Sequence, residues 1–294
     1  MKRNAYSVRV VPNVHNLLGE CPMWHPVEQR LYWIDTRLPA VMRQEEDGSV
    51  SQWPMPVNIG SYVFREQGGL IAGLQTGFSE IALDDFSVAP RVNPEPHKPL
   101  NRLNDGRCDR RGRYWAGTRD PGNDCASGSL YCLTSDFEVS KKDEGFIVPN
   151  GLAFSPDDQS LVFGCTRGDT IYRYDFDLPS GDIGNRRIFI DTSGTPWRVD
   201  GATFDSEGFY WAALIGGGAI GRFDANGRLD RFIPLPYQYP TMCNFGGKDL
   251  DVLYVTTGTF FVDEDGRRRQ PLAGCMFAIH GLGVQGVPEP IFPG

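Results

Sequence analysis

The stretch that decides the fold begins with a turn at Pro149-Asn150-Gly151 and ends with an aromatic residue followed by aspartate, Tyr174-Asp175. A second turn, Ser155-Pro156-Asp157-Asp158, lies between them. Three apolar, strand-like segments fill the rest: Leu152-Ala153-Phe154, Ser160-Leu161-Val162-Phe163-Gly164 and Thr170-Ile171-Tyr172-Arg173-Tyr174. Turns and strands alternate with no room for a helix, so the stretch predicts consecutive antiparallel strands.

The same order of turns and strands recurs elsewhere in the chain. It recurs after Asp200-Gly201, through a turn at Ser206-Glu207-Gly208, and after Asn104-Asp105-Gly106, through a turn at Arg111-Gly112. Six apolar runs mark the repeat, and their second positions are residues 32, 71, 114, 162, 210 and 254. Their spacings are 39, 43, 48, 48 and 44 residues. This period, with strand signals and no helical phase, predicts a six-bladed β-propeller of four-stranded antiparallel blades around a central channel.

Length and composition agree with this prediction. A closed array of repeats is one domain whatever its length, so residues 1–294 are expected to form a single propeller domain. The N-terminal segment around Val8-Arg9-Val10-Val11 is expected to supply the strand that closes the ring against the last blade. The seven cysteines have no zinc-site spacing and are expected to be mostly small buried apolar residues.

Charge and hydropathy exclude two classes of partner. A net charge of −8 and a pI near 5.1 argue against binding to nucleic acid, which needs clustered Lys and Arg. No segment approaches the roughly 20 apolar residues of a membrane span, and no apolar segment follows Met1-Lys2-Arg3. We therefore expect a cytoplasmic protein without a membrane partner.

Polar residues recur at one phase of the repeat, ahead of five of the six apolar runs. Glu20 lies 12 residues before Tyr32, and Asn104, Asn150, Asp200 and Asn244 occupy corresponding places. This phase should be the start of each innermost strand, where the side chains face the channel. Any one of these residues alone is an ordinary turn former. Carboxylates gathered in a narrow channel, however, are costly without a cation. Glu20, Asn150 and Asp200 offer an all-oxygen set that suits a hard divalent ion.

Several motifs at these positions resemble the SMP-30/gluconolactonase/regucalcin family. They span about residues 16–260: Leu18-Gly19-Glu20-Cys21-Pro22-Met23-Trp24, Asn101-Arg102-Leu103-Asn104-Asp105-Gly106, Gly112-Arg113-Tyr114-Trp115-Ala116-Gly117-Thr118, Pro149-Asn150-Gly151-Leu152-Ala153-Phe154 and Asn244-Phe245-Gly246-Gly247. The resemblance implies a six-bladed propeller and a metal-dependent lactonase. It implies one divalent ion, Ca²⁺, Zn²⁺, Mn²⁺ or Mg²⁺, held by Glu20, Asn150 and Asp200. It also implies Asp200 as general base, with Arg102 and Asn104 as substrate contacts.

The chain departs from the family pattern at three places. Cys21 stands where the family often has Gly, and Val199-Asp200-Gly201 stands where it often has Pro-Asp-Gly. The loop after Thr118, residues 119–124, does not align with the family's acidic substrate-binding residue. The resemblance therefore leaves the identity of the sugar open.

The predicted chemistry is hydrolysis of a sugar lactone to the aldonic acid in carbohydrate catabolism. Arg102 and Asn104, two residues apart, should share one face of an extended strand, and Arg198 stands in the same relation to Asp200. Two such arginines suggest a lactone with an anionic substituent, unless both simply face solvent. Two other functions stay open. One is a phosphotriesterase-type hydrolase on the same scaffold, and the other is a non-enzymatic calcium-binding or interaction propeller.

Overall fold

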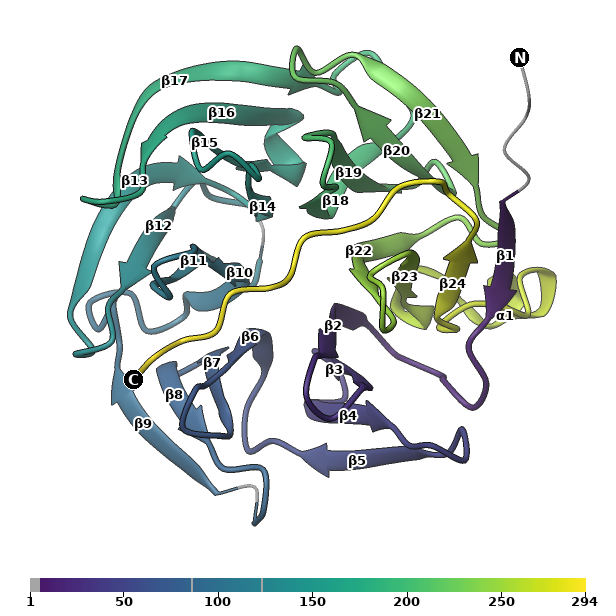
Figure 1. The fold of residues 1–294 in the computed structure, drawn as a ribbon, viewed down its shortest axis with the longest axis horizontal. Coiled ribbons are helices and arrows are strands. Elements are labelled where there is room, and N and C mark those ends of the chain that lie inside the picture. The colour runs from purple at the N-terminus through teal and green to yellow at the C-terminus, as the bar shows by residue number, and fades with distance from the viewer. Residues whose placement is uncertain (1–5, 86, 123) are drawn as a thin grey trace. The chain divides into compact units, whose positions relative to one another are not determined.

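The computed structural model describes residues 6–85, 87–122 and 124–294. Residues 1–5, which include Met1-Lys2-Arg3, and Asn123 in the loop after Thr118 lie outside the described residues. The strands form six four-stranded antiparallel sheets. The helices in the described part are the short 3-10 segments η1 (Thr166–Gly168) and η2 (Thr259–Phe261) and the helix α1 (Glu264–Arg269) (Figure 1). The predicted fold class, a six-bladed β-propeller of four-stranded blades, is confirmed.

The chain folds into two compact units, each with three of the six sheets. Unit 1 comprises residues 6–55 and 194–288. Its sheets are β2 (Gly19–His25), β3 (Arg30–Asp35), β4 (Ala40–Gln44) and β5 (Val50–Pro54); β18 (Arg198–Phe204), β19 (Tyr210–Ile215), β20 (Ala219–Phe223) and β21 (Leu229–Pro234); and β22 (Pro240–Gly246), β23 (Val252–Thr257), β24 (Phe277–His280) and β1 (Ser7–Val10).

Unit 2 comprises residues 56–193 and 289–294. Its sheets are β6 (Ile59–Phe64), β7 (Leu70–Leu74), β8 (Gly77–Ile81) and β9 (Val88–Val92); β10 (Arg102–Cys108), β11 (Tyr114–Arg119), β12 (Gly128–Leu133) and β13 (Val139–Phe146); and β14 (Pro149–Phe154), β15 (Ser160–Cys165), β16 (Thr170–Asp177) and β17 (Asp182–Asp191). The strands of the opening stretch are thus confirmed as β14, β15 and β16.

One sheet of unit 1 joins distant parts of the chain. Strand β1 pairs antiparallel with β24, and Ser7 lies opposite His280. Figure 1 shows the purple N-terminal strand beside the yellow-green β24. The expectation that the N-terminal segment completes the last blade is confirmed.

Large aromatic side chains fill the space between neighbouring sheets of each unit. In unit 2, Trp115 of β11 and Phe163 of β15 belong to one buried cluster, and both are fully buried. In unit 1, Trp211 of β19 packs edge-on against Phe245 of β22, with ring centroids 5.7 Å apart. Burial of each such ring contributes on the order of 2 to 3 kcal/mol. Six of the seven cysteines are buried, which confirms the expectation that most of them are, and Cys125 is exposed.

We call β2, β6, β10, β14, β18 and β22 the first strands of their sheets, and each of them carries a shift of register. The shifts lie at Glu20/Met23, Ile59/Ser61, Leu103/Gly106, Asn150/Ala153, Val199/Ala202 and Pro240/Met242. A bulge of this kind leaves one residue unpaired and turns a side chain away from the regular pleat. The predicted turns Asn104-Asp105-Gly106, Asn150-Gly151 and Asp200-Gly201 are therefore not turns but bulges inside β10, β14 and β18. Their Asn, Asp and Gly residues resemble turn signals because bulges need similar backbone freedom.

Candidate functional site

Glu20 is the second residue of β2, opposite Ile34 of β3, and its side chain is half-buried. The next residue, Cys21, has φ = 48°, in the left-handed region that favours glycine. This is the position where the family pattern often has Gly. Cys21 therefore adopts a backbone conformation that costs conformational energy in a residue other than glycine. This conformation places Glu20 at the start of the bulge.

Asp200 is the third residue of β18, inside its bulge, and is 6% exposed. The neighbouring Gly201 has no space for a side chain, because a Cβ there would lie 2.3 Å from Cγ of Met242 on β22. This close approach of β18 and β22 holds the backbone around the Asp200 carboxylate. Arg198 opens the same strand, and its Nη1 donates to the carbonyls of Thr195 and Trp197 at 3.2 and 3.1 Å.

In unit 2 the structure brings two predicted site residues into contact. Nδ2 of Asn104 donates to Oδ1 of Asn150 at 3.0 Å and to the Pro149 carbonyl at 2.9 Å. Nδ2 of Asn150 donates to the hydroxyl of Thr166 at 2.9 Å. Because Asn150 is 7% exposed and is held at both ends of its amide group, its carbonyl oxygen is fixed in direction. Arg102 opens β10, is 8% exposed, and donates to the Leu103 carbonyl at 3.1 Å.

Asp105 has a structural role that the sequence did not reveal. One of its carboxylate oxygens accepts the Leu152 backbone N–H at 2.8 Å, across from β10 to the bulge of β14. Gly151 in that bulge has φ = 70°. Burial raises the pKa of Asp105, while backbone N–H groups and Arg107 act in the opposite direction. The buried carboxylate thus fixes the bulge that carries Asn150. The signal in the sequence is the Asn-Asp-Gly motif, which predicts a turn but forms a bulge in β10.

The expectation for Asn244 is wrong. It is the fifth residue of β22 and lies directly opposite Tyr254, well past the start of the strand. Counting back from the apolar run fails here because Tyr254 is the third residue of β23, whereas Tyr114 and Tyr210 open β11 and β19. Thr241 stands near the start of β22 instead, and its hydroxyl donates to the Gly19 carbonyl at 2.6 Å.

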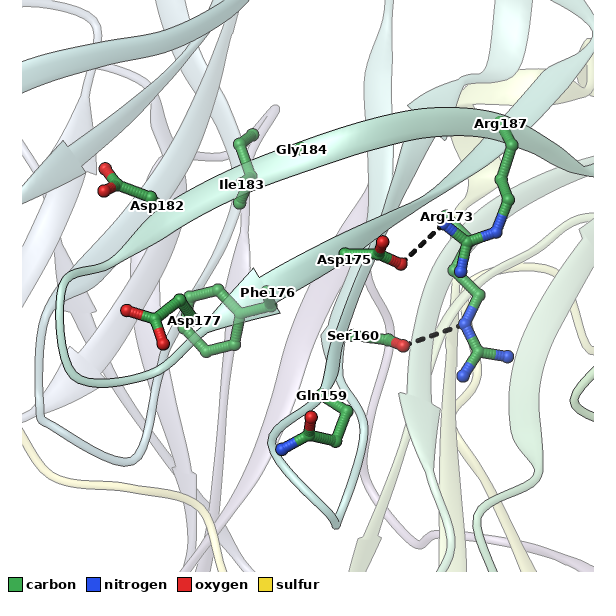
Figure 2. Close-up of a pocket in the computed structure, with 10 residues that line it drawn as sticks. All are labelled: Gln159, Ser160, Arg173, Asp175, Phe176, Asp177, Asp182, Ile183, Gly184 and Arg187. Carbon is green, nitrogen blue, oxygen red and sulfur yellow. Dashed lines mark hydrogen bonds and ion pairs between the residues drawn. The ribbon is translucent and has the colours of Figure 1, made fainter.

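A groove of about 620 Å³ in unit 2 lies elsewhere, along the outer strands β16 and β17 (Figure 2). Both of its arginines have partners within the groove. Arg187 pairs with Asp175 at 2.7 Å, and Nε of Arg173 donates to Ser160 at 2.9 Å. Burial, and next the charge of Arg187, lower the pKa of Arg173. None of the predicted site residues lines this groove.

Residues 18–259 match the model of a single protein family, described as the SMP-30/gluconolactonase/LRE-like region. The chain belongs to this family. The matched range contains all six of the predicted site residues. Membership of the SMP-30/gluconolactonase family confirms the expectation of a gluconolactonase-like lactonase.

Relatives of the family are similar over almost their whole length. A 6-deoxy-6-sulfogluconolactonase of Pseudomonas putida is 37% identical over 98% of this chain and 99% of that protein. The pentonolactonase XacC of Haloferax volcanii is 34% identical over 92% of this chain and 93% of its own. Among solved structures, a calcium-binding regucalcin of Agrobacterium tumefaciens has a TM-score of 0.92 at 26% identity, covering 98% of this chain and 97% of that one.

Proposed function

We propose that this protein hydrolyses a sugar lactone to the corresponding aldonic acid, as a step in carbohydrate catabolism. The observation that carries the proposal is the similarity, over more than nine tenths of the chain, to two proteins named as lactonases of sugar acids. A lactone is an internal ester, so its hydrolysis needs an attacking water, a group that accepts a proton from it, and a stabiliser for the charge on the carbonyl oxygen.

Glu20, Asn150 and Asp200 are proposed to hold one divalent ion, Ca²⁺, Zn²⁺, Mn²⁺ or Mg²⁺. In support, all three offer oxygen, and each stands at the bulge of a first strand. A carboxylate as buried as that of Asp200 is costly to keep ionised without a compensating cation. Oδ1 of Asn150 keeps a second lone pair after accepting the Asn104 N–H. When bound, such an ion supplies Lewis-acid activation of the lactone carbonyl.

Asp200 is proposed to accept the proton of the attacking water. This role is typically worth about 10² to 10⁴ in rate. Arg102 and Asn104 are proposed to bind hydroxyl groups of the sugar, since their side chains leave the same strand two residues apart. Arg198, in the corresponding place before Asp200, is proposed to favour a lactone with an anionic substituent.

The test is a panel of aldonolactones, some neutral and some anionic, assayed by the release of acid. The protein is first stripped of metal and then reloaded with one ion at a time. Hydrolysis of at least one lactone, lost on stripping and restored by one of the four ions, supports the proposal. Turnover of a fluorophosphate alone would instead favour the phosphotriesterase alternative, and no turnover of either would favour the non-enzymatic one.

We further propose a cytoplasmic setting. None of the seven cysteines, all of which the structure describes, is in a disulfide, and Cys125 exposes its thiol, which suits a reducing compartment. No helix in the described part of the chain is both long and apolar enough to cross a membrane.

A further inference from the structure

Three exposed apolar side chains of unit 1 lie close together. Leu17 precedes β2, Leu38 lies in the turn between β3 and β4, and Phe260 belongs to η2; they are 39%, 50% and 50% exposed. The Phe260 N–H donates to the Leu17 carbonyl at 2.9 Å, and the Asp35 carboxylate accepts the N–H groups of Leu17 and Leu38 at 2.6 and 2.9 Å. Single exposed apolar side chains are ordinary, but exposed ones that gather mark a binding surface.

Two half-buried aromatic rings extend this surface. Phe261 lies beside Phe260, with ring centroids 5.5 Å apart. Tyr239, which directly precedes β22, stacks on Phe261 with centroids 5.3 Å apart and an angle of 26° between the rings. We refer to Leu17, Leu38, Tyr239, Phe260 and Phe261 as the aromatic patch. It joins segments that are far apart in the chain.

The aromatic patch lies next to the strand starts around Glu20. Leu17 is three residues before Glu20, so their Cα atoms are at most about 11 Å apart. Tyr239 is two residues before Thr241, whose hydroxyl donates to the carbonyl of Gly19, the neighbour of Glu20. Both ends of the patch are therefore tied to the proposed metal ligand, within reach of a substituent on a lactone bound there.

The backbone of the patch is fixed before any ligand binds. Asp35 is 1% exposed, and its carboxylate accepts the N–H groups of Leu18 at 3.2 Å and Arg37 at 2.9 Å in addition to those of Leu17 and Leu38. A preformed surface loses less conformational entropy on binding than a flexible one. This arrangement therefore suits recognition of a ligand.

Arg37 adds hydrogen-bond donors at the edge of the patch. Its guanidinium carbon lies 4.0 Å from the centroid of the Phe260 ring. A guanidinium that stacks on a ring can still donate from the N–H groups along its own edge. A sugar ring has the matching chemistry, because its C–H faces are apolar and its hydroxyl groups lie around its edge. An alkyl chain would make no use of the donors, and a small anion would make no use of the rings.

We propose that the aromatic patch binds a second sugar ring of the substrate, so that this protein prefers aldonolactones that carry a glycosyl substituent. The inference rests on the proposed lactonase function and adds a specificity-determining surface to it. It does not depend on whether the lactone is charged.

The test compares the wild type with Phe260→Ala on glucono-1,5-lactone and on its 4-O- and 6-O-galactosyl derivatives, all of which are uncharged. We expect the wild type to have a higher kcat/KM for at least one galactosylated lactone than for glucono-1,5-lactone. Phe260→Ala should lower that value about 10-fold, mainly through KM, because the stacking contact is lost. Glucono-1,5-lactone has no second ring and should change less than about 2-fold. Phe260→Tyr keeps the ring and should behave like the wild type.

Phe232→Ala is the matched control. Phe232 is 47% exposed, close to the value for Phe260, and lies on the outer strand β21 of the same unit. Its replacement should leave the preference among the three lactones unchanged. Thermal melts of each variant separate these results from a loss of folding.

The inference is overturned, and the lactonase function left standing, if the wild type shows no preference for a galactosylated lactone. No change in Phe260→Ala, or equal changes on all three lactones, has the same meaning. If the wild type hydrolyses no lactone with any metal, the proposed function fails, and calorimetry with the 4-O- and 6-O-galactosylgluconic acids still tests the patch. Weaker binding by Phe260→Ala than by the wild type then supports it, and unchanged binding or no binding by the wild type refutes it.

Discussion

The side-chain nitrogen of Asn104 lies 3.0 Å from Oδ1 of Asn150 and donates a hydrogen bond to it across two neighbouring first strands. If Asn150 is a metal ligand, this bond orients the ligating oxygen. We expect Asn104→Leu, which fills the space without the donor, to weaken metal binding about 10-fold. Calorimetric titration of stripped protein measures this. Unchanged affinity together with lower activity would assign Asn104 to the substrate alone.

Asp200 carries two proposed roles, as ligand and as base. Asp200→Asn keeps the shape of the side chain but removes its negative charge, and we expect kcat to fall at least about 10²-fold at saturating metal. Asp249→Asn, on the exposed turn after β22, is the control and should leave kcat unchanged. A kcat near that of the wild type for Asp200→Asn would remove Asp200 from the chemistry.

Arg198 provides a separate test of the proposed anionic substituent. Arg198→Ala is expected to raise KM for a charged lactone more than for a neutral one, because only the charged substrate loses an ionic contact. Steady-state kinetics with both lactones measure the difference. Equal changes in the two KM values would contradict this prediction.

Asp205 is fully buried and accepts the indole N–H of Trp211 and the Nε–H of Arg222, both at 2.8 Å. Replacing it with alanine leaves these buried donors without that acceptor, so we expect Asp205→Ala to lower the free energy of unfolding by at least about 3 kcal/mol. Urea denaturation measures this. Asp230→Ala removes a more exposed partner of the same arginine and should cost less than about 1 kcal/mol.

Glu95 gives a prediction of pH dependence. It is 2% exposed; its burial acts to raise the pKa, but hydrogen bonds from Asn101, Lys98 and Thr118 outweigh this and hold it below the usual 4.5. A lowered folded-state pKa stabilises the protein above pH 4.5, and this contribution is lost as the pH falls through the folded-state value. Glu95→Gln should therefore destabilise the protein at pH 7, and the difference from the wild type should shrink at lower pH. Denaturation curves at several pH values check this, and a constant difference would contradict it.

The sequence predicted the number and order of sheets because the apolar runs that mark each repeat are also the strands that fill the core. Trp115 and Trp211 stand in equivalent runs and are both fully buried. The pattern was less informative at the starts of the first strands. Asn150-Gly151 predicts a turn but forms a bulge, because both structures need a residue that can adopt a positive φ angle.

Three features of the site could not be predicted from the sequence, because they depend on which residues of different strands lie opposite or beside each other. The partner of Asn244 follows from the length of its hairpin turn, which periodicity does not give. The role of Asp105 depends on a contact to the next sheet, and the hydrogen bond from Thr241 to Gly19 joins strands from distant parts of the chain. That the two units close into one domain, and that Glu20, Asn150 and Asp200 share one ion, stay predictions.

The pairing of β1 with β24 has a consequence for how the protein is made. During synthesis β1 leaves the ribosome long before its partner β24 is translated. The outer edge of β24 therefore stays open until the two distant segments meet, a late step with a high entropic cost. A chain that lacks β1 would expose that edge as a template for pairing with other molecules. We expect such truncated chains to aggregate rather than to lose activity alone.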